Sequence, residues 1–250
     1  MEIILETNKY LIGATKEKKY LEQSFKLRYE DLILAFDEKK QKNKTDYSTY
    51  DDFCEHIVCI DKETDEVVGS YRIATKESLK TKPFVSEEEY NIDNLKAKYK
   101  LLEASRAVVK KEYQNTMVMT FLWQAVINYA FDNDIDYLFG TASFKGVDPT
   151  PYTHVFSYLY YNFLIDEAIM PKATKNKFKL NMVPKDHIDM QIVKEKMPVI
   201  LKGYCVINAK IAAEGYIDYD FNSVDVFVLL DIKNINPRVL KRFVKQKKTE

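Results

Sequence analysis

The chain has 250 residues, enough for one large domain or two small ones, and its 46% hydrophobic and 30% charged residues are typical of globular proteins. Basic and acidic residues both number 38, so the formal net charge is zero and no global attraction to nucleic acid is expected. With 6 glycines and 3 cysteines, the chain offers no glycine-rich nucleotide loop, and it favours a reducing compartment over a disulfide scaffold.

The sequence shows neither a signal peptide nor a run approaching the ~20 apolar residues of a membrane span. We therefore expect a cytoplasmic protein, with any membrane contact peripheral and on the inner face of the membrane.

Hydrophobic periodicity predicts alternating strands and helices. In chain order we expect a strand over 10–15, a helix over 16–39, a polar loop over 41–52, a hairpin of strands over 56–61 and 66–74, a helix over 86–98, a strand over 101–109, a helix over 116–131, a strand over 137–144, a helix over 152–163, an irregular basic insertion over 170–196, strands over 199–207 and 224–230, and a helix over 237–244. This order indicates a single α/β domain over 1–250, built around a central mixed sheet.

The apolar run 101–109 contains two opposite charges, Glu103 and Arg106. Charges rarely enter a buried strand unless they are paired or used in function. In a regular strand the two side chains would point to opposite faces, whereas a β-bulge between them would bring both to one face and open the sheet locally. The run by itself leaves two interpretations open, a structural salt bridge near a strand end and a functional pair.

Two further segments each have a structural and a functional interpretation. The loop that carries Asp46 and Asp51 is either a solvated loop or a carboxylate cluster that binds an amine. The strand over 137–144 ends in small residues, which permit close approach of a ligand to the backbone but are also common at tight strand–loop transitions. No spacing of histidine or cysteine matches a metal site, so we expect none.

Several segments taken in order resemble one family. They are Glu66-Val67-Val68-Gly69-Ser70-Tyr71-Arg72, Leu102-Glu103-Ala104-Ser105-Arg106, Phe121-Leu122-Trp123, Leu138-Phe139-Gly140-Thr141-Ala142-Ser143-Phe144, Pro198-Val199-Ile200-Leu201-Lys202-Gly203-Tyr204, and Asp218-Tyr219-Asp220-Phe221-Asn222-Ser223-Val224-Asp225-Val226-Phe227. Over 28–242 this order resembles the hemolysin-like ornithine N-acyltransferases that make lyso-ornithine lipid. That family is similar to N-acyl amino acid synthases and, more distantly, to acyl-homoserine-lactone synthases. The resemblance implies a GNAT-like N-acyltransferase fold, with a mostly antiparallel sheet flanked by helices and a bulged fourth strand.

The resemblance also implies site residues. It places an arginine on the first helix, acidic residues in the following loop, an arginine at the end of the third strand and Glu-x-x-Arg on the fourth strand, matched by Arg28, Asp46, Asp51, Arg72, Glu103 and Arg106. On this hypothesis Glu103 is the base that deprotonates an amine and Arg106 orients it. The loop carboxylates hold a cationic side chain, Arg28 or Arg72 takes the acceptor carboxylate, and Ser143 and Phe144 contact substrate.

The acyl donor is inferred from a difference between this sequence and the acetyl-CoA-dependent GNAT enzymes. GNAT enzymes that use acetyl-CoA hold its pyrophosphate with a glycine-containing loop after the fourth strand, but 110–116 has no glycine here. This favours an acyl group on the phosphopantetheine of acyl carrier protein, with no cofactor bound by the chain itself. Lys110 and Lys111, together with the basic run 172–179, would contact that acidic carrier.

The implied reaction moves a fatty or 3-hydroxy-fatty acyl group from acyl carrier protein to the α-amine of ornithine, and a separate O-acyltransferase would complete the lipid. Two alternatives stay open: an N-acyl amino acid synthase with another acceptor such as glycine, and a non-catalytic, membrane-active protein.

Overall fold

The computed structural model describes residues 1–38 and 44–243, which form two compact units. The first unit comprises Met1–Lys82 and Leu102–Ile135, with the chain from Leu240 onward, and the second comprises Pro83–Leu101 and Asp136–Val239. The single domain expected over 1–250 stays a prediction, and each unit is described by itself.

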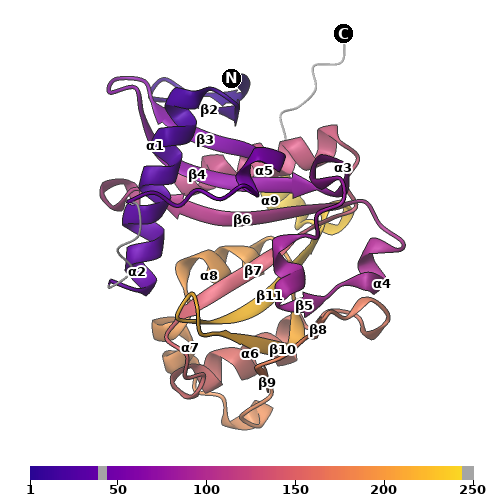
Figure 1. Ribbon diagram of the computed structural model, residues 1–250. Helices are drawn as coiled ribbons and strands as arrows, with labels where there is room; N and C mark the ends of the chain where they lie inside the picture. The colour runs from indigo at the N-terminus through magenta and orange to yellow at the C-terminus, as the bar shows by residue number, and fades with distance from the viewer. Residues whose placement is uncertain (39–43, 244–250) are drawn as a thin grey trace. The chain divides into compact units, whose positions relative to one another are not determined.

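The first unit is an antiparallel sheet with helices on both faces. Its elements are β1 (Glu2–Glu6), β2 (Tyr10–Thr15), α1 (Lys18–Arg28), a π-helical turn (Tyr29–Ile33), α2 (Leu34–Phe36), a 3₁₀ turn (Asp51–Phe53), β3 (Glu55–Asp61), β4 (Glu66–Thr75), α3 (Lys76–Leu79), β6 (Leu101–Val109), a 3₁₀ turn (Lys111–Tyr113) and α5 (Val118–Asp132). The strands are ordered β1-β2-β3-β4-β6, and every paired neighbour runs antiparallel. Figure 1 shows α1 lying across β3 and β4.

Alternation along β4 separates the two helix layers. On one face of β4, the Ser70 hydroxyl accepts a hydrogen bond from the Ser24 hydroxyl of α1 at 2.9 Å. The neighbouring Gly69 lies on the other face, against α5. A Cβ on Gly69 would lie 2.7 Å from Val118 Cγ1 and 3.0 Å from Leu122 Cδ1, both on α5. A glycine at this position therefore allows α5 to pack closely on the sheet.

An apolar cluster fixes α1 on the opposite face. Leu27 packs with Val58, Ile60, Val67 and Val108, all buried. Burial of each such side chain contributes about 1.5–3 kcal/mol relative to exposure. The helix predicted over 16–39 begins at Lys18 and is interrupted by the π-helical turn directly after Arg28.

The second unit has its own antiparallel sheet. Its elements are a 3₁₀ turn (Val85–Glu88), β5 (Tyr90–Asn91), α4 (Asp93–Lys96), β7 (Tyr137–Lys145), a 3₁₀ turn (Thr150–Tyr152), α6 (Thr153–Phe163), a 3₁₀ turn (Glu167–Ile169), β8 (Lys172–Ala173), β9 (Lys177–Lys179), a 3₁₀ turn (Lys185–His187), α7 (Met190–Lys196), α8 (Val199–Val206), β10 (Lys210–Asp218), β11 (Ser223–Asp231) and a 3₁₀ turn (Ile232–Asn234). The strands are ordered β7-β11-β10-β9, and β5 pairs separately with β8. Helix α9 (Pro237–Phe243) follows, and residue 244 of the predicted helix lies outside the described residues.

Aromatic rings fill the core of the second unit. Phe139 lies between Phe84 and Phe227, with ring centroids 5.1 Å and 5.6 Å apart respectively. Tyr90 is fully buried against Phe227, and its hydroxyl donates to the backbone carbonyls of Glu214 and Asp225 at 3.2 Å and 3.0 Å. Burial raises the pKa of Tyr90 well above its usual range, so the hydroxyl keeps its proton for these bonds.

The predicted fold class is confirmed: an α/β structure with a mostly antiparallel sheet flanked by helices. Two predicted elements are wrong. The strand expected over 199–207 is helix α8, since a short apolar run fits either structure and Pro198 precedes its first turn. The helix expected over 86–98 is divided by β5, because Tyr90 pairs with Ala173.

Two strands, β1 and β10, were missed, and the 170–196 segment contains β8, β9 and α7. Within residues 1–38 and 44–243, no helix has both the length and the apolar character needed to cross a membrane.

Candidate active site

The predicted bulge lies in β6, the fourth long strand of the first unit's sheet after β2, β3 and β4. Ser70 of β4 is opposite Val108, but Arg72, two residues further on, is opposite Ser105, three residues back. The bulge therefore adds one residue to β6 between Ser105 and Val108, and Arg106 lies within it. The φ of Arg106 is +55°, in the left-handed region. The fourth strand is thus bulged at the residue that the sequence analysis singled out.

The bulge gathers polar side chains on the face covered by α1. Ser105 lies directly across from Arg72 and accepts a hydrogen bond from its Nε at 3.0 Å. Arg106 donates from Nε to Asp46 at 2.9 Å, and Arg28 of α1 binds the same carboxylate. The carboxylate of Glu103 accepts a hydrogen bond on this face as well, from Tyr50. The predicted convergence of Glu103 and Arg106 on one face is confirmed.

Arg28 is the centre of an ion-pair network. Its Nε and Nη2 approach Asp46 Oδ2 at 2.8 Å and 2.7 Å, and its Nη1 lies 2.7 Å from Asp51 Oδ1. Arg72 Nη1 reaches the same Asp51 oxygen at 3.4 Å. Charge-assisted bonds of this kind fix both the arginines and the loop that carries the acids. Because Arg28 is only 1% exposed, this network is part of the interior.

Charge pairing outweighs burial at the two aspartates. Burial alone would raise the pKa of Asp51, but Arg28 and Arg72 lower it to about 2. At Asp46 burial is likewise opposed by the charges of Arg106 and Arg28, which hold its pKa below the usual range. Both carboxylates are therefore ionised at neutral pH.

His56 lies beside this network as a neutral group. It is buried on β3, and its Nε2 lies 3.2 Å from the Asp51 carbonyl oxygen. Burial lowers its pKa, so the imidazole is uncharged at neutral pH. A histidine that is buried and hydrogen-bonded in this way has a structural role.

Exposure separates the members of the network. The side chains of Arg28, Arg72 and Asp51 are 1%, 3% and 1% exposed. Arg106 and Asp46 are 29% and 17% exposed, so this pair is the least buried part of the network. A partly buried cation–anion pair on the sheet face that also carries a buried glutamate is suited to an amino-acid acceptor and its deprotonation.

The predicted substrate residues Ser143 and Phe144 lie in the second unit, on β7. They are consecutive on a strand whose pairing with β11 has no register shift, so their side chains point to opposite faces. Phe144 is buried against Tyr152 and Phe156, with centroids 4.8 Å from each. Phe144 thus belongs to the aromatic core, and Ser143 faces the other side.

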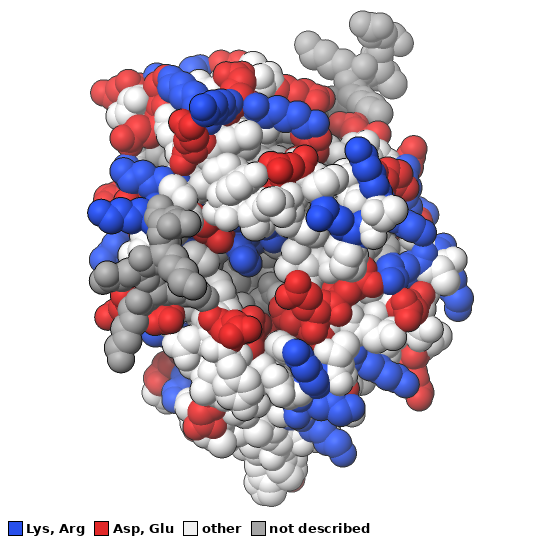
Figure 2. All heavy atoms as spheres, in the orientation of Figure 1, with Lys and Arg blue, Asp and Glu red and all other residues white. Residues whose placement is uncertain are grey.

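The predicted carrier-binding lysines follow β6 directly. Lys110 Nζ donates to Glu66 at 2.9 Å, and Lys111 is exposed. Figure 2 shows basic and acidic side chains interspersed over the face in view, in keeping with the zero formal net charge. A carrier that binds at Lys110 would compete with Glu66 for that ammonium group.

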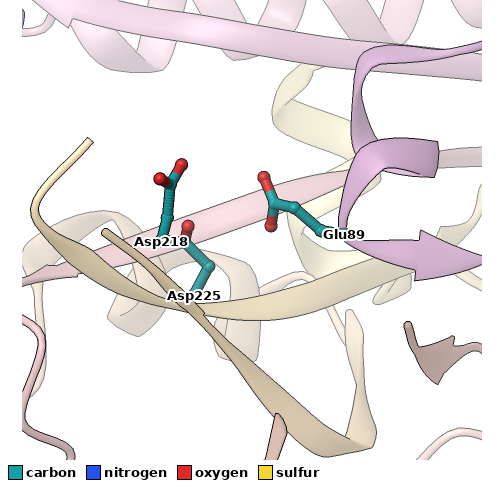
Figure 3. Close-up of side chains that lie close together, drawn as sticks. All are labelled: Glu89, Asp218 and Asp225. Carbon is teal, nitrogen blue, oxygen red and sulfur yellow. The ribbon is translucent and has the colours of Figure 1, made fainter. Parts of the chain in front are cut away.

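A second carboxylate cluster, which the sequence analysis missed, lies in the second unit. One carboxylate oxygen from each of Glu89, Asp218 and Asp225 lies within 4.8 Å of the other two. Figure 3 shows the three carboxylates together. Asp218 accepts from the backbone N–H groups of Asp220 and Phe221, both at 2.8 Å, and Asp225 accepts from the Ser223 hydroxyl at 3.1 Å. These bonds give Asp218 and Asp225 structural roles, and the spacing alone assigns the cluster no ligand.

Comparison with known proteins gives the class of the chain. Residues 27–124 match the family model described as the acetyltransferase (GNAT) domain. The solved CoA-dependent acyl-homoserine lactone synthase BjaI, with MTA, shares the fold at a TM-score of 0.54 and 15% identity, over 94% of this chain and 87% of that one. A second CoA-dependent synthase, MesI, gives 0.50 at 10% identity, over 90% and 86%. The chain is an acyltransferase with a GNAT fold.

Nearly the whole sequence also resembles curated proteins named L-ornithine N(alpha)-acyltransferase. The Brucella abortus relative is 28% identical over 253 residues, covering 97% of this chain and 88% of the relative. The Agrobacterium fabrum relative is 26% identical over 253 residues, covering 97% and 85%. The resemblance drawn from the ordered segments is confirmed.

Proposed function

We propose that this chain transfers a fatty acyl group from acyl carrier protein to the α-amine of ornithine, forming the N-acylornithine of a lyso-ornithine lipid. The observation that carries the proposal is the buried Glu103, held on the same sheet face as the less buried Asp46–Arg106 pair. The likeness to L-ornithine N(alpha)-acyltransferases supports this choice of acceptor.

The chemical step is aminolysis of a thioester. Glu103 accepts a proton from the α-ammonium of the acceptor, directly or through a water. The free amine attacks the thioester carbonyl carbon, whose oxygen is polarised by main-chain N–H groups beside the bulge. The C–N bond forms, the C–S bond breaks, and the proton that the attacking nitrogen then loses passes to the sulfur, so that the carrier leaves as a thiol. No covalent enzyme intermediate is required.

The acceptor is recognised by charge. Asp46 holds the side-chain ammonium of ornithine, and Arg106 takes its carboxylate, since these are the more exposed members of the network. The family resemblance implied Arg28 or Arg72 as the partner of the acceptor carboxylate. The burial of both favours a supporting role for them, with Asp51 between them. In that role they fix the loop 46–51 against the sheet.

The donor follows from the segment after β6, which has no glycine between 110 and 116. Lys110 and Lys111 would meet the acidic carrier there, which delivers the acyl chain on phosphopantetheine. Acyl-CoA is the competing donor, and the two donors are to be compared directly in the same assay.

The test is formation of N-acylornithine, followed by mass spectrometry, from purified protein, acyl carrier protein loaded with a 3-hydroxy fatty acid, and ornithine. Glu103→Gln keeps the side-chain volume but removes the base, so we expect kcat/KM to fall by about 100-fold or more. Glu6→Gln, an exposed glutamate on the edge strand β1, is the matched control and should keep full activity.

Full activity in Glu103→Gln would remove that residue from the role of base. Faster acylation of glycine than of ornithine would replace the acceptor and leave the chemistry intact. Absence of transfer from any acyl donor to any amino acid would overturn the enzyme function.

A further inference from the structure

Tyr50 connects the glutamate of β6 to the arginine network. Its hydroxyl donates to Glu103 Oε2 at 3.2 Å. The face of its ring lies against Arg72, with the guanidinium carbon 4.9 Å from the ring centroid. Its carbonyl accepts from the Cys54 thiol at 3.3 Å. The ring, the hydroxyl and the backbone of Tyr50 are therefore each held by a different neighbour.

In the bond with Glu103, the Tyr50 hydroxyl is the donor and the carboxylate is the acceptor. Burial and the nearby Glu103 carboxylate raise the pKa of Tyr50 well above its usual range. The phenol thus remains a hydrogen-bond donor at every pH at which the enzyme would work. Arg72, in turn, is fixed by Asp51 and Ser105, so the ring rests on a guanidinium that is itself immobilised.

From this geometry we infer that Tyr50 is a positioning residue for acyl transfer: it holds the Glu103 carboxylate in the orientation that receives the amine's proton. The inference rests on the proposed function, because it assigns a partner to the proposed base. The phenol binds one oxygen of Glu103, so it restricts rotation of the carboxylate and favours one rotamer.

The neighbouring Tyr47 provides a matched control. It lies on the same loop, and its hydroxyl donates to a different carboxylate, Asp52, at 3.0 Å. Its ring packs on Phe25 at 5.3 Å, but the residue is 50% exposed. Removing this hydroxyl deletes the same type of bond without touching Glu103.

The experiment compares Tyr50→Phe, Tyr47→Phe and wild type in the acyl-transfer assay with acyl carrier protein and ornithine. For Tyr50→Phe we expect kcat to fall about 10-fold, the size of a lost hydrogen bond to a charged group, with KM for ornithine little changed. Tyr47→Phe should match wild type in kcat and KM.

A double-mutant cycle separates positioning from general support. In a Glu103→Gln background, Tyr50→Phe should have little further effect, because the group it orients has already lost its function. Additive losses would overturn the inference.

A folded Tyr50→Phe with wild-type kcat would also overturn it while leaving the proposed function standing. A Tyr50→Phe that does not fold, judged by circular dichroism, would overturn it in favour of a purely structural role. An inactive wild type would overturn the proposed function and this inference together.

Discussion

The two units bury carboxylates in different ways. In the first unit Asp46 and Asp51 are bound by the guanidinium groups of Arg28, Arg72 and Arg106. In the second unit the cluster of Glu89, Asp218 and Asp225 brings three acids within 4.8 Å, and the bonds at the two aspartates come from backbone N–H groups and a hydroxyl.

Only in the first unit do cations cancel the charge of the buried acids. Removing a cation from the first unit leaves buried carboxylates with less neutralising charge. Removing an acid from the second unit reduces the repulsion between its carboxylates. The comparison therefore predicts opposite signs for substitutions that look equivalent in sequence.

The largest expected effect is at the centre of the network. Arg28→Met leaves two carboxylates facing an apolar side chain, so the free energy of unfolding should fall by about 3–5 kcal/mol in urea denaturation. Lys26→Met, on the same helix, removes an exposed cation whose ion pair with Glu30 spans 3.8 Å, and should leave the stability unchanged. Equal effects of the two substitutions would contradict the network's importance.

A smaller effect is expected at Asp51 and depends on pH. Because its pKa is about 2, below the ordinary value, its ionisation stabilises the fold above about pH 4, and this contribution is lost as the pH falls through about 2. Wild type should exceed Asp51→Asn by about 2 kcal/mol from this source at neutral pH, and the difference should shrink between about pH 4 and 2.

Asp52→Asn, one residue further on and exposed, is the control for that pH series. Chemical denaturation at each pH gives the comparison, and a pH-independent difference between wild type and Asp51→Asn would refute the linkage.

The smallest effect tests the second unit. Asp225 is 2% exposed, and Asn in its place keeps an acceptor for Ser223 while removing one of three like charges. Asp225→Asn should raise the free energy of unfolding at pH 7, in EDTA, by less than about 1 kcal/mol. Asp220→Asn, exposed in the adjacent turn, is the control. A loss of several kcal/mol in Asp225→Asn would show that both units depend on their acids in the same way.

The strand with two embedded charges was the most predictable part of the site. Regular alternation would place Glu103 and Arg106 on opposite faces, and a bulge would bring them to one face. The family resemblance implied that bulge, and the register shift in β6 supplies it. Arg28 was identified through the family resemblance alone. Its pairing with the loop acid Asp46 was not predicted, because residues on a helix and a distant loop have no spacing that signals contact.

Other features could not be read from local pattern. Tyr50 was missed because an aromatic residue in a polar loop has no periodicity, and only the folded loop places its hydroxyl on Glu103. Glu89 is too far in sequence from Asp218 and Asp225 to be grouped with them before the fold is known. The apolar run of α8 fits strand and helix equally, and tertiary packing decides between them.

The bulge at Arg106 also has a consequence for the phase of the strand. On β4, Ser70 and Arg72 are two residues apart, while their partners on β6, Val108 and Ser105, are three apart. The extra residue is therefore absorbed locally, and the inside–outside alternation resumes on both sides of it. Val108 keeps its place under α1, in the apolar cluster. The bulge thus places Arg106 on the face of β6 covered by α1 and keeps Val108 in its apolar position on that face.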